Sequence, residues 1–188
     1  GITGEIVTEN VKTIKKIPLR IEKEAPQIIE LRGEIFFRLN DFEKINEHLE
    51  ESGNKKFVSP RNAAAGTLRN LDLETVKHRP LDVFFYGLGG HSDDLKIQSQ
   101  KEFLNFLKLN NFPINELISF GDKEHAKISV DNIFNSRENL SYEIDGAVVK
   151  VNDFNQQNKL GFVSKAPRWA TAWKFPASEK YSKVTDIL

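Results

Sequence analysis

Residues 143–150 read Glu-Ile-Asp-Gly-Ala-Val-Val-Lys, and residues 172–176 read Ala-Trp-Lys-Phe-Pro. Both stretches have the apolar, β-branched or aromatic composition of a strand, and each carries one lysine, Lys150 in the first and Lys174 in the second. A lysine that a strand points inward needs an anionic partner, because an unpaired buried charge costs several kcal/mol. The two strands therefore predict a bound anion, and a phosphate would suit them.

The rest of the chain mixes strands and helices without a regular alternation. We expect further strands at residues 27–37 and 83–88, so that with residues 144–151 and 169–175 the chain has four. We expect helices at residues 5–13, 101–109 and 130–139, one from an Asn40 cap to Gly53, and a short one that begins at Ser59-Pro60. A polar turn should join residues 151 and 169. This order favours an α+β fold over a doubly wound sheet.

The composition excludes several classes of site. A chain of 188 residues that is 39% hydrophobic can bury one sizeable core. It contains no cysteine, its four histidines lack metal-ligand spacing, and it has no glycine-rich phosphate loop. The 27 basic residues equal the 27 acidic ones, so a site for a polyanion must come from local clustering.

The ends and the hydropathy suggest where the chain comes from. No apolar run reaches transmembrane length and no signal peptide is evident, so we expect a cytoplasmic protein without a membrane partner. The chain starts at Gly1 and contains no methionine, which predicts a fragment of a longer polypeptide.

Residues 59–69, Ser-Pro-Arg-Asn-Ala-Ala-Ala-Gly-Thr-Leu-Arg, combine small side chains with two arginines. On a helix Arg61 and Arg69 would lie roughly 80° apart, within reach of one broad anion, while the small residues let another surface approach. The alternative, at about even weight, is a helix packed tightly on a sheet with solvated arginines.

Two residues have the chemistry to hold a nucleoside. Glu34 could accept hydrogen bonds from sugar hydroxyls, and Gly33 would leave room for the sugar. The alternative is an ion pair between Glu34 and an arginine at a sheet edge. Tyr86, followed by Gly87, could stack on a base, although an aromatic residue in a strand is most often part of the core.

The segment from Lys150 to Lys174 is basic. It contains Lys150, Lys159, Lys165, Arg168 and Lys174 against the single acid Asp153, a local excess suited to a phosphodiester backbone. Solvated lysines on a turn are the alternative and are the simpler account of Lys159. Asp145, at the start of the first strand, could bind magnesium beside a phosphate or cap a turn.

Several of these stretches occur together and in order in one known family. They are residues 31–34 (Leu-Arg-Gly-Glu), 59–69, 83–87 (Val-Phe-Phe-Tyr-Gly), 145–150, 166–170 (Ala-Pro-Arg-Trp-Ala) and 173–176 (Trp-Lys-Phe-Pro). In this combination the chain closely resembles the nucleotidyltransferase (adenylation) domain of bacterial NAD-dependent DNA ligases. The Asp-Gly and Lys-Phe-Pro pieces recur more loosely in ATP-dependent ligases and capping enzymes.

The resemblance implies an ATP-grasp-like nucleotidyltransferase fold, with antiparallel sheets flanked by helices, and a three-step reaction. A lysine takes AMP from NAD, the AMP passes to the 5′-phosphate of nicked duplex DNA, and the neighbouring 3′-hydroxyl displaces it, with Mg²⁺ neutralising charge. It implies that Glu34 binds the ribose, that Tyr86 stacks on adenine, and that Lys150 and Lys174 meet the AMP phosphate. The remaining implied roles are Arg61, Arg69, Arg137 and Arg168 for pyrophosphate or DNA, and Asp145 for the metal or for orienting a lysine.

The chain departs from the family in one important respect. The family's nucleophile lies in a Lys-x-Asp-Gly motif, which occurs nowhere in these residues. We therefore expect an adenylation domain at 1–181, incomplete at its N-terminus, followed at 182–188 by a linker toward an OB-fold, and no self-adenylation by this piece. The other ligase modules, including the one that binds zinc, would lie elsewhere in the parent.

Two other functions remain open from the sequence. A non-catalytic nucleotide or nucleic-acid binding module could keep this fold without the nucleophile. An ATP-dependent ligase or an RNA-capping guanylyltransferase is the third possibility, which the Ala-rich run of residues 63–65 makes less favourable.

Overall fold

The computed structural model describes residues 3–164 and 166–176. Lys165, the expected domain end at residue 181 and the expected linker at 182–188 lie outside the described residues. Within the described ranges, no helix combines the length and the apolar character needed to cross a membrane.

The described residues form helices and short antiparallel ribbons. The helices are α1 (Thr8–Lys12), α2 (Leu39–Glu51), α3 (Pro60–Leu68), α4 (Leu73–Lys77), α5 (Gln100–Leu109), α6 (Lys123–Ser136) and α7 (Phe154–Leu160), with a 3-10 turn η1 (Arg137–Asn139). The strands are β1 (Ile29–Phe36), β2 (Asp82–His91), β3 (Gly146–Lys150), β4 (Phe162–Val163), β5 (Ala166–Pro167) and β6 (Ala170–Lys174). They pair as β1–β2, β3–β6 and β4–β5, all antiparallel. The mixture confirms the α+β prediction.

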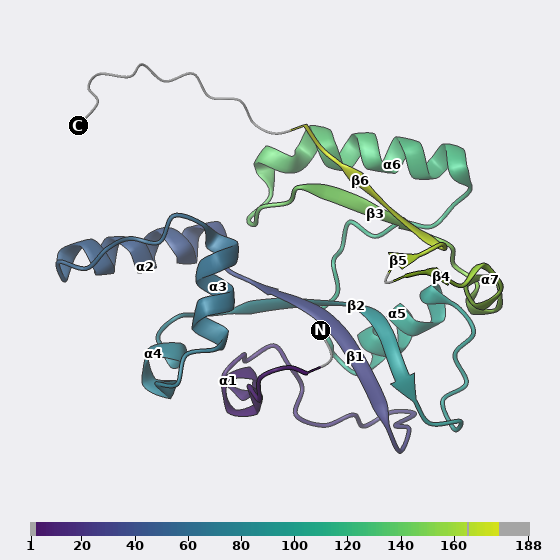
Figure 1. The fold of residues 1–188 in the computed structure, drawn as a ribbon, viewed down its shortest axis with the longest axis horizontal. Coiled ribbons are helices and arrows are strands. Elements are labelled where there is room, and N and C mark those ends of the chain that lie inside the picture. The colour runs from purple at the N-terminus through teal and green to yellow at the C-terminus, as the bar shows by residue number, and fades with distance from the viewer. Residues whose placement is uncertain (1–2, 165, 177–188) are drawn as a thin grey trace.

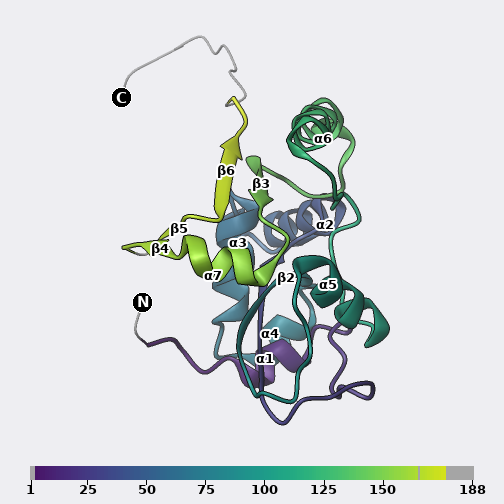
Figure 2. The ribbon, with the colours of Figure 1, turned by 90° about the vertical axis from the view of Figure 1, so that its right-hand side faces the viewer.

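The two longer ribbons lie one above the other. In Figure 1 the β3–β6 ribbon lies above the β1–β2 ribbon, and α6 runs along its outer side. Figure 2 shows from the side that α6 lies beside β3 and away from β2. The ring of Phe134 on α6 lies 5.2 Å from that of Phe175, just after β6, so aromatic packing fixes α6 to this ribbon.

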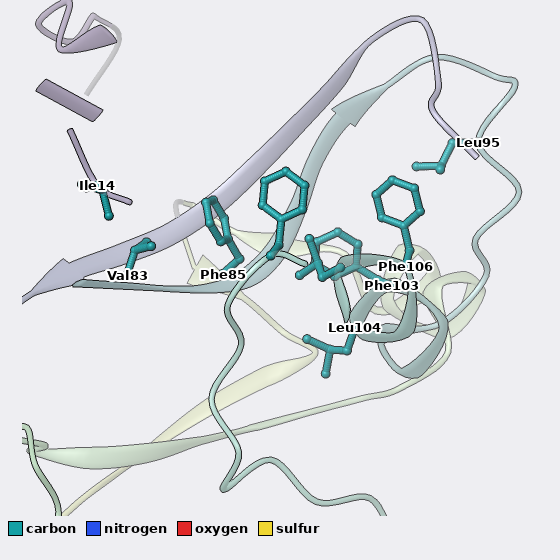
Figure 3. Close-up of a cluster of buried hydrophobic side chains, with 9 residues drawn as sticks. Ile14, Val83, Phe85, Leu95, Phe103, Leu104 and Phe106 are labelled. Carbon is teal, nitrogen blue, oxygen red and sulfur yellow. The ribbon is translucent and has the colours of Figure 1, made fainter. Parts of the chain in front are cut away.

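The larger hydrophobic core lies between β2 and α5. Val83 and Phe85 of β2 meet Phe103, Leu104, Phe106 and Leu107 of α5, together with Ile14, Leu95 and Phe112 (Figure 3). Ser99 caps α5 by accepting a hydrogen bond from the amide of Glu102, and Phe103 and Leu107 are fully buried. One face of the β1–β2 ribbon therefore packs against α5. A ligand could bind only on the other face.

A second, smaller core holds α2 and α3. Ala63 and Ala64 pack against Phe37, which directly follows β1, and against Ile45 of α2. This confirms tight packing as the role of those two alanines, whereas Ala65 and Gly66 are exposed. Ser59 caps α3 as predicted, since its side chain accepts a hydrogen bond from the amide of Asn62.

Several boundaries differ from the sequence prediction. The Asn40 cap is wrong, because α2 begins at Leu39 and Arg38 occupies the capping position without a side-chain hydrogen bond. Helix α6 begins at Lys123 behind an Asp122 cap, seven residues before the predicted start, and the N-terminal helix is confined to α1. The predicted polar turn contains α7, capped by Asp153, whose polar sequence has no apolar periodicity to reveal it.

Candidate functional site

The register of the β3–β6 ribbon places Lys150 and Lys174 on one face. Gly146 lies opposite Lys174, and Lys150 lies opposite Ala170. Directly paired residues point to the same side of a sheet, and so do residues two or four apart along a strand. Four residues of strand separate the two lysine positions by about 13 Å. The lysines therefore share a face but stand at opposite ends of it.

Lys150 reaches from β3 to β2. Its Nζ donates a hydrogen bond of 3.1 Å to the carbonyl of Tyr86 and lies 5.0 Å from the centre of the Tyr86 ring, a cation–π contact. Burial lowers the pKa of Lys150. Among the described residues no carboxylate lies within ion-pair distance of this ammonium group. The sequence prediction of an inward lysine that lacks a protein anion thus fits Lys150.

Tyr86 occupies a bulge in the β1–β2 ribbon. Arg32 pairs with Gly87 and Gly33 pairs with Phe85, so Tyr86 is the extra residue on β2. Its carbonyl accepts hydrogen bonds from Lys150 and, at 2.9 Å, from the side chain of Gln100. Tyr86 is 42% exposed and not part of the core, so the part of its ring that Lys150 does not cover is available for stacking. Gln100 was not predicted as a site residue, because nothing in its local sequence indicates a hydrogen bond to the Tyr86 carbonyl.

Lys174 differs from the expectation that it points inward. Its side chain is 67% exposed, and its Nζ donates a 2.6 Å hydrogen bond to Asp145, which is itself exposed. The hydrogen bond from Lys174 lowers the pKa of Asp145, and the positive charges of Lys174 and Arg61 add to the effect. Lys174 is the last residue of β6, and in the part of the chain that the structure describes its side chain stays largely exposed. Among the described residues, the Asp145 carboxylate therefore pairs with Lys174.

Glu34 lies on the solvent-facing side of the β1–β2 ribbon. It pairs with Phe84 in the ladder, and its carboxylate lies 3.6 Å from the guanidinium of Arg61 on α3. The predicted ion pair is therefore present, although both side chains are largely exposed. Gly33 has a different role from the one predicted. A Cβ at Gly33 would lie 3.0 Å from the Phe84 carbonyl and 3.2 Å from the Phe85 ring, so the glycine permits packing on the core side.

The predicted nucleic-acid arginines are dispersed. Arg61 and Arg69 stand at opposite ends of α3, about 12 Å apart along its axis, and Arg69 turns its Nε back to the carbonyl of Ala65 at 3.2 Å. Arg137 donates to the carbonyl of Pro176 at 3.2 Å and stacks on Phe134. Arg168 is exposed beside β6. The structure does not bring these four side chains to one point.

No metal centre made of protein ligands is evident. In residues 3–164 and 166–176, no group of three or more histidine, aspartate or glutamate side chains could hold a metal ion. Magnesium commonly takes only one or two carboxylates and completes its shell with water and substrate phosphates. Asp145 fits such a ligand set as the single protein carboxylate.

The arrangement as a whole suits an elongated anionic ligand that has a flat end. Tyr86 and Lys150 offer a ring and an ammonium group at one end. Lys174 and Arg61 offer exposed positive charges at the other, and the Glu34 carboxylate can accept hydrogen bonds from hydroxyl groups. A nucleotide has these three parts in this order.

Known proteins match the chain along its whole length. The model of the family described as NAD-dependent DNA ligase adenylation domain matches residues 1–178. The DNA ligase of Rickettsia canadensis is 46% identical over 188 residues, which cover 100% of this chain and 27% of that protein. The DNA ligases of Citrifermentans bemidjiense and Myxococcus xanthus are 43% and 42% identical, with 28% of each protein covered. The chain thus spans about a quarter of the length of these relatives.

Proposed function

The chain belongs to the NAD-dependent DNA ligase adenylation domain family, and on that basis we propose that it holds the adenylate of NAD within a ligase that seals nicks between 5′-phosphate and 3′-hydroxyl ends of duplex DNA. The nucleotidyltransferase fold is part of this proposal. So is the assignment of residues 1–181 to the adenylation domain and of 182–188 to a linker toward an OB-fold. The remaining ligase domains of the parent and the nicked DNA would be its partners.

The observation that carries the proposal is the contact of Lys150 with Tyr86. A half-buried lysine without a carboxylate partner among the described residues is an unfavourable arrangement for stability alone. It becomes favourable when a ligand supplies lone pairs or negative charge beside the ammonium group. Because the Tyr86 ring lies directly beneath it, that ligand should be aromatic as well as polar.

The other residues take roles according to their place on this face. Glu34 would accept hydrogen bonds from the ribose hydroxyls, which would compete with its long contact to Arg61. Lys174 and Arg61 would meet the phosphate, with Asp145 holding Lys174 in place until the ligand arrives. Lys150 was predicted to meet the phosphate as well, but its contact with Tyr86 favours a place at the base end of this face. Arg69, Arg137 and Arg168 lie farther out and would contact the DNA backbone.

The residues fit the group that the family uses. NAD supplies the adenylyl group, and Mg²⁺ neutralises charge on the phosphates. Asp145 is the carboxylate at the phosphate end of this face that could bind the metal, and it would then lose its hydrogen bond from Lys174. Zinc has no ligand set among the described residues and would belong to another module of the parent.

We propose that neither Lys150 nor Lys174 is the attacking lysine. A lowered pKa favours nucleophilic lysines, which makes Lys150 a tempting choice. Its ammonium group, however, donates to the Tyr86 carbonyl beneath the proposed base, away from the phosphate end. We assign the nucleophile to a lysine outside these 188 residues. Mass mapping of the AMP-modified lysine in the full-length protein tests this, and AMP on Lys150 or Lys174 would refute it.

The function itself is tested by sealing of a labelled nick in the full-length protein. Lys150→Ala and Lys174→Ala should each abolish sealing while thermal unfolding stays close to that of the parent. Lys127→Ala, on the exposed side of α6, is the matched control and should seal normally. Sealing by the Lys150 variant at a near-parental rate would refute the nucleotide site. Preference for ATP or GTP over NAD would favour the other nucleotidyltransferases, and binding without any adduct would favour a non-catalytic module.

A further inference from the structure

The side-chain amide of Asn10 joins α1 to the end of α3. Its Nδ2 donates hydrogen bonds to the carbonyls of Leu68 at 2.8 Å and Asn70 at 2.7 Å. The last four carbonyls of a helix have no partner within that helix. Asn10 therefore completes the C-terminal end of α3 from a segment 58 to 60 residues earlier in the sequence.

Asn10 is itself held firmly. The hydroxyl and the amide of Thr13 both donate to the Asn10 carbonyl, at 2.7 and 3.1 Å. The next residue, Ile14, is 2% exposed and belongs to the larger core. Figure 1 shows α1 beside α4 and close to the end of α3, and α4 packs against both helices. The two hydrogen bonds from the Asn10 side chain, called the Asn10 clamp, therefore connect α3 to the larger core.

Arg69 stands between the two clamped carbonyls. It caps α3, and both its backbone amide and its Nε donate to the carbonyl of Ala65. The rest of its guanidinium is exposed. Because Asn10 fixes the backbone immediately before and after Arg69, it restricts the directions in which that guanidinium can point.

A hollow of about 540 Å³ lies at the same place. One wall is the segment that leads into α1, and the other is the end of α3. It is lined by Thr3, Gly4, Glu5, Val7, Leu68 and Arg69. The Asn10 hydrogen bonds tie α1, which follows the first wall, to the end of α3, which forms the second.

We propose that Asn10 is a positioning residue that acts through Arg69, holding its guanidinium at this hollow to bind a phosphate of the DNA backbone. This rests on the proposed function, in which Arg69 contacts DNA. A purely structural Asn10 would lower the stability of the domain without changing what Arg69 contributes to binding. A positioning role and a purely structural role can therefore be separated by measuring whether the effects of substituting Asn10 and Arg69 on DNA binding are additive.

The experiment is a double-mutant cycle on binding of nicked duplex DNA by the full-length protein, measured over a range of salt concentrations. Arg69→Ala should weaken binding and reduce the salt slope by about 0.9 for one lost phosphate contact. Asn10→Ala should weaken binding by a smaller factor, within the roughly two- to hundredfold range of coupled neighbours. The double variant should bind no more weakly than Arg69→Ala alone. Asn10→Leu, which removes the donor and adds no charge, should behave like Asn10→Ala.

A matched control is Asn54→Ala, because this exposed asparagine also bonds a nearby carbonyl, that of Ser52, but takes no part in the hydrogen bonds at the end of α3. It should leave binding and salt slope unchanged. Additive losses in the double variant would overturn the proposal, and so would an Asn10→Ala protein that binds normally. If Arg69→Ala itself binds normally, the assignment of Arg69 to DNA fails first. If Asn10→Ala does not fold, the cycle is repeated with Asn10→Ser. If Asn10→Ser also does not fold, the role of Asn10 is structural and the proposal is overturned.

Discussion

Gly146→Ala is the substitution with the clearest structural consequence. Gly146 opens β3 directly opposite Lys174 on β6. An added Cβ would lie 2.5 Å from the Trp173 carbonyl oxygen, 3.1 Å from the Lys174 Cα and 3.2 Å from the Trp173 carbonyl carbon. All three atoms belong to the backbone, so no side chain can rotate away and the ladder itself must open.

The size of the effect follows from that geometry. Overpacking of this kind costs about 1–3 kcal/mol. For a chain of this length each kcal/mol lowers the melting temperature by about 2–4 °C, so we expect a loss of roughly 2–12 °C. The displaced backbone carries Lys174. The 2.6 Å hydrogen bond from the Lys174 side chain to Asp145 should therefore also be lost.

The assays are thermal unfolding and nick sealing by the full-length protein. The melting temperature and the sealing rate should both decrease in Gly146→Ala. The loss of sealing should be larger than the fraction of unfolded protein explains. Gly87→Ala is the control in the other ribbon, because its Cβ would meet the Arg32 side chain at an ordinary 3.5 Å. A Gly146→Ala protein as stable and as active as the parent would refute the register between β3 and β6.

Three further substitutions have defined outcomes. Gly66→Ala places a Cβ where nothing lies within 4 Å, so the free energy of unfolding, measured by thermal unfolding, should rise by about 0.5–1 kcal/mol. Weaker binding of DNA by the same variant would show that the DNA approaches α3 at this position. The buried Thr67 hydroxyl has no hydrogen-bond partner among the described residues, so Thr67→Val should raise stability in urea denaturation by about 1 kcal/mol. Burial raises the pKa of Asp82, but hydrogen bonds from Lys16, the Val83 amide and Arg38 outweigh it, and the pKa lies below its ordinary value. Asp82 therefore stabilises the fold above the pKa of an unfolded aspartate and loses that contribution as the pH falls through its lowered pKa, so Asp82→Asn should flatten the acid limb of stability against pH.

Each of these outcomes can fail in a recognisable way. An unchanged melting temperature in Gly66→Ala would mean that the helix does not extend through that position. A Thr67→Val variant less stable than the parent would point to an ordered water on the hydroxyl. An Asp82→Asn variant with the parental acid profile would assign the pH dependence to other carboxylates.

The sequence predicted much of the secondary structure because the signals there are local. The Ser59-Pro60 start of α3 and the apolar spacing of α5 both lie within one segment, and both predictions are confirmed. Helix α4 was missed although Asp72 caps it by accepting from the amide of Glu74. The cap was a usable signal, but five residues offer too little periodicity to support it.

The placement of side chains in the site was harder to predict. The sequence identified Lys150 and Lys174 as functional candidates but treated both as inward. Which of them is covered depends on what lies above each end of the β3–β6 ribbon. At the Lys150 end the bulged strand β2 approaches closely enough to accept a hydrogen bond, whereas at the Lys174 end the partner among the described residues is the exposed Asp145.

The sequence by itself determined the family, the strand character of the lysine-bearing segments and the types of residue available for binding a nucleotide. These follow from local composition and from motifs in a fixed order. Only the tertiary structure decided that the two lysines stand about 13 Å apart on one face, that a bulge presents the Tyr86 carbonyl to Lys150, and that Asn10 clamps the end of α3. Strand register and contacts between segments some 60 residues apart depend on how whole elements pack, and no local pattern encodes them.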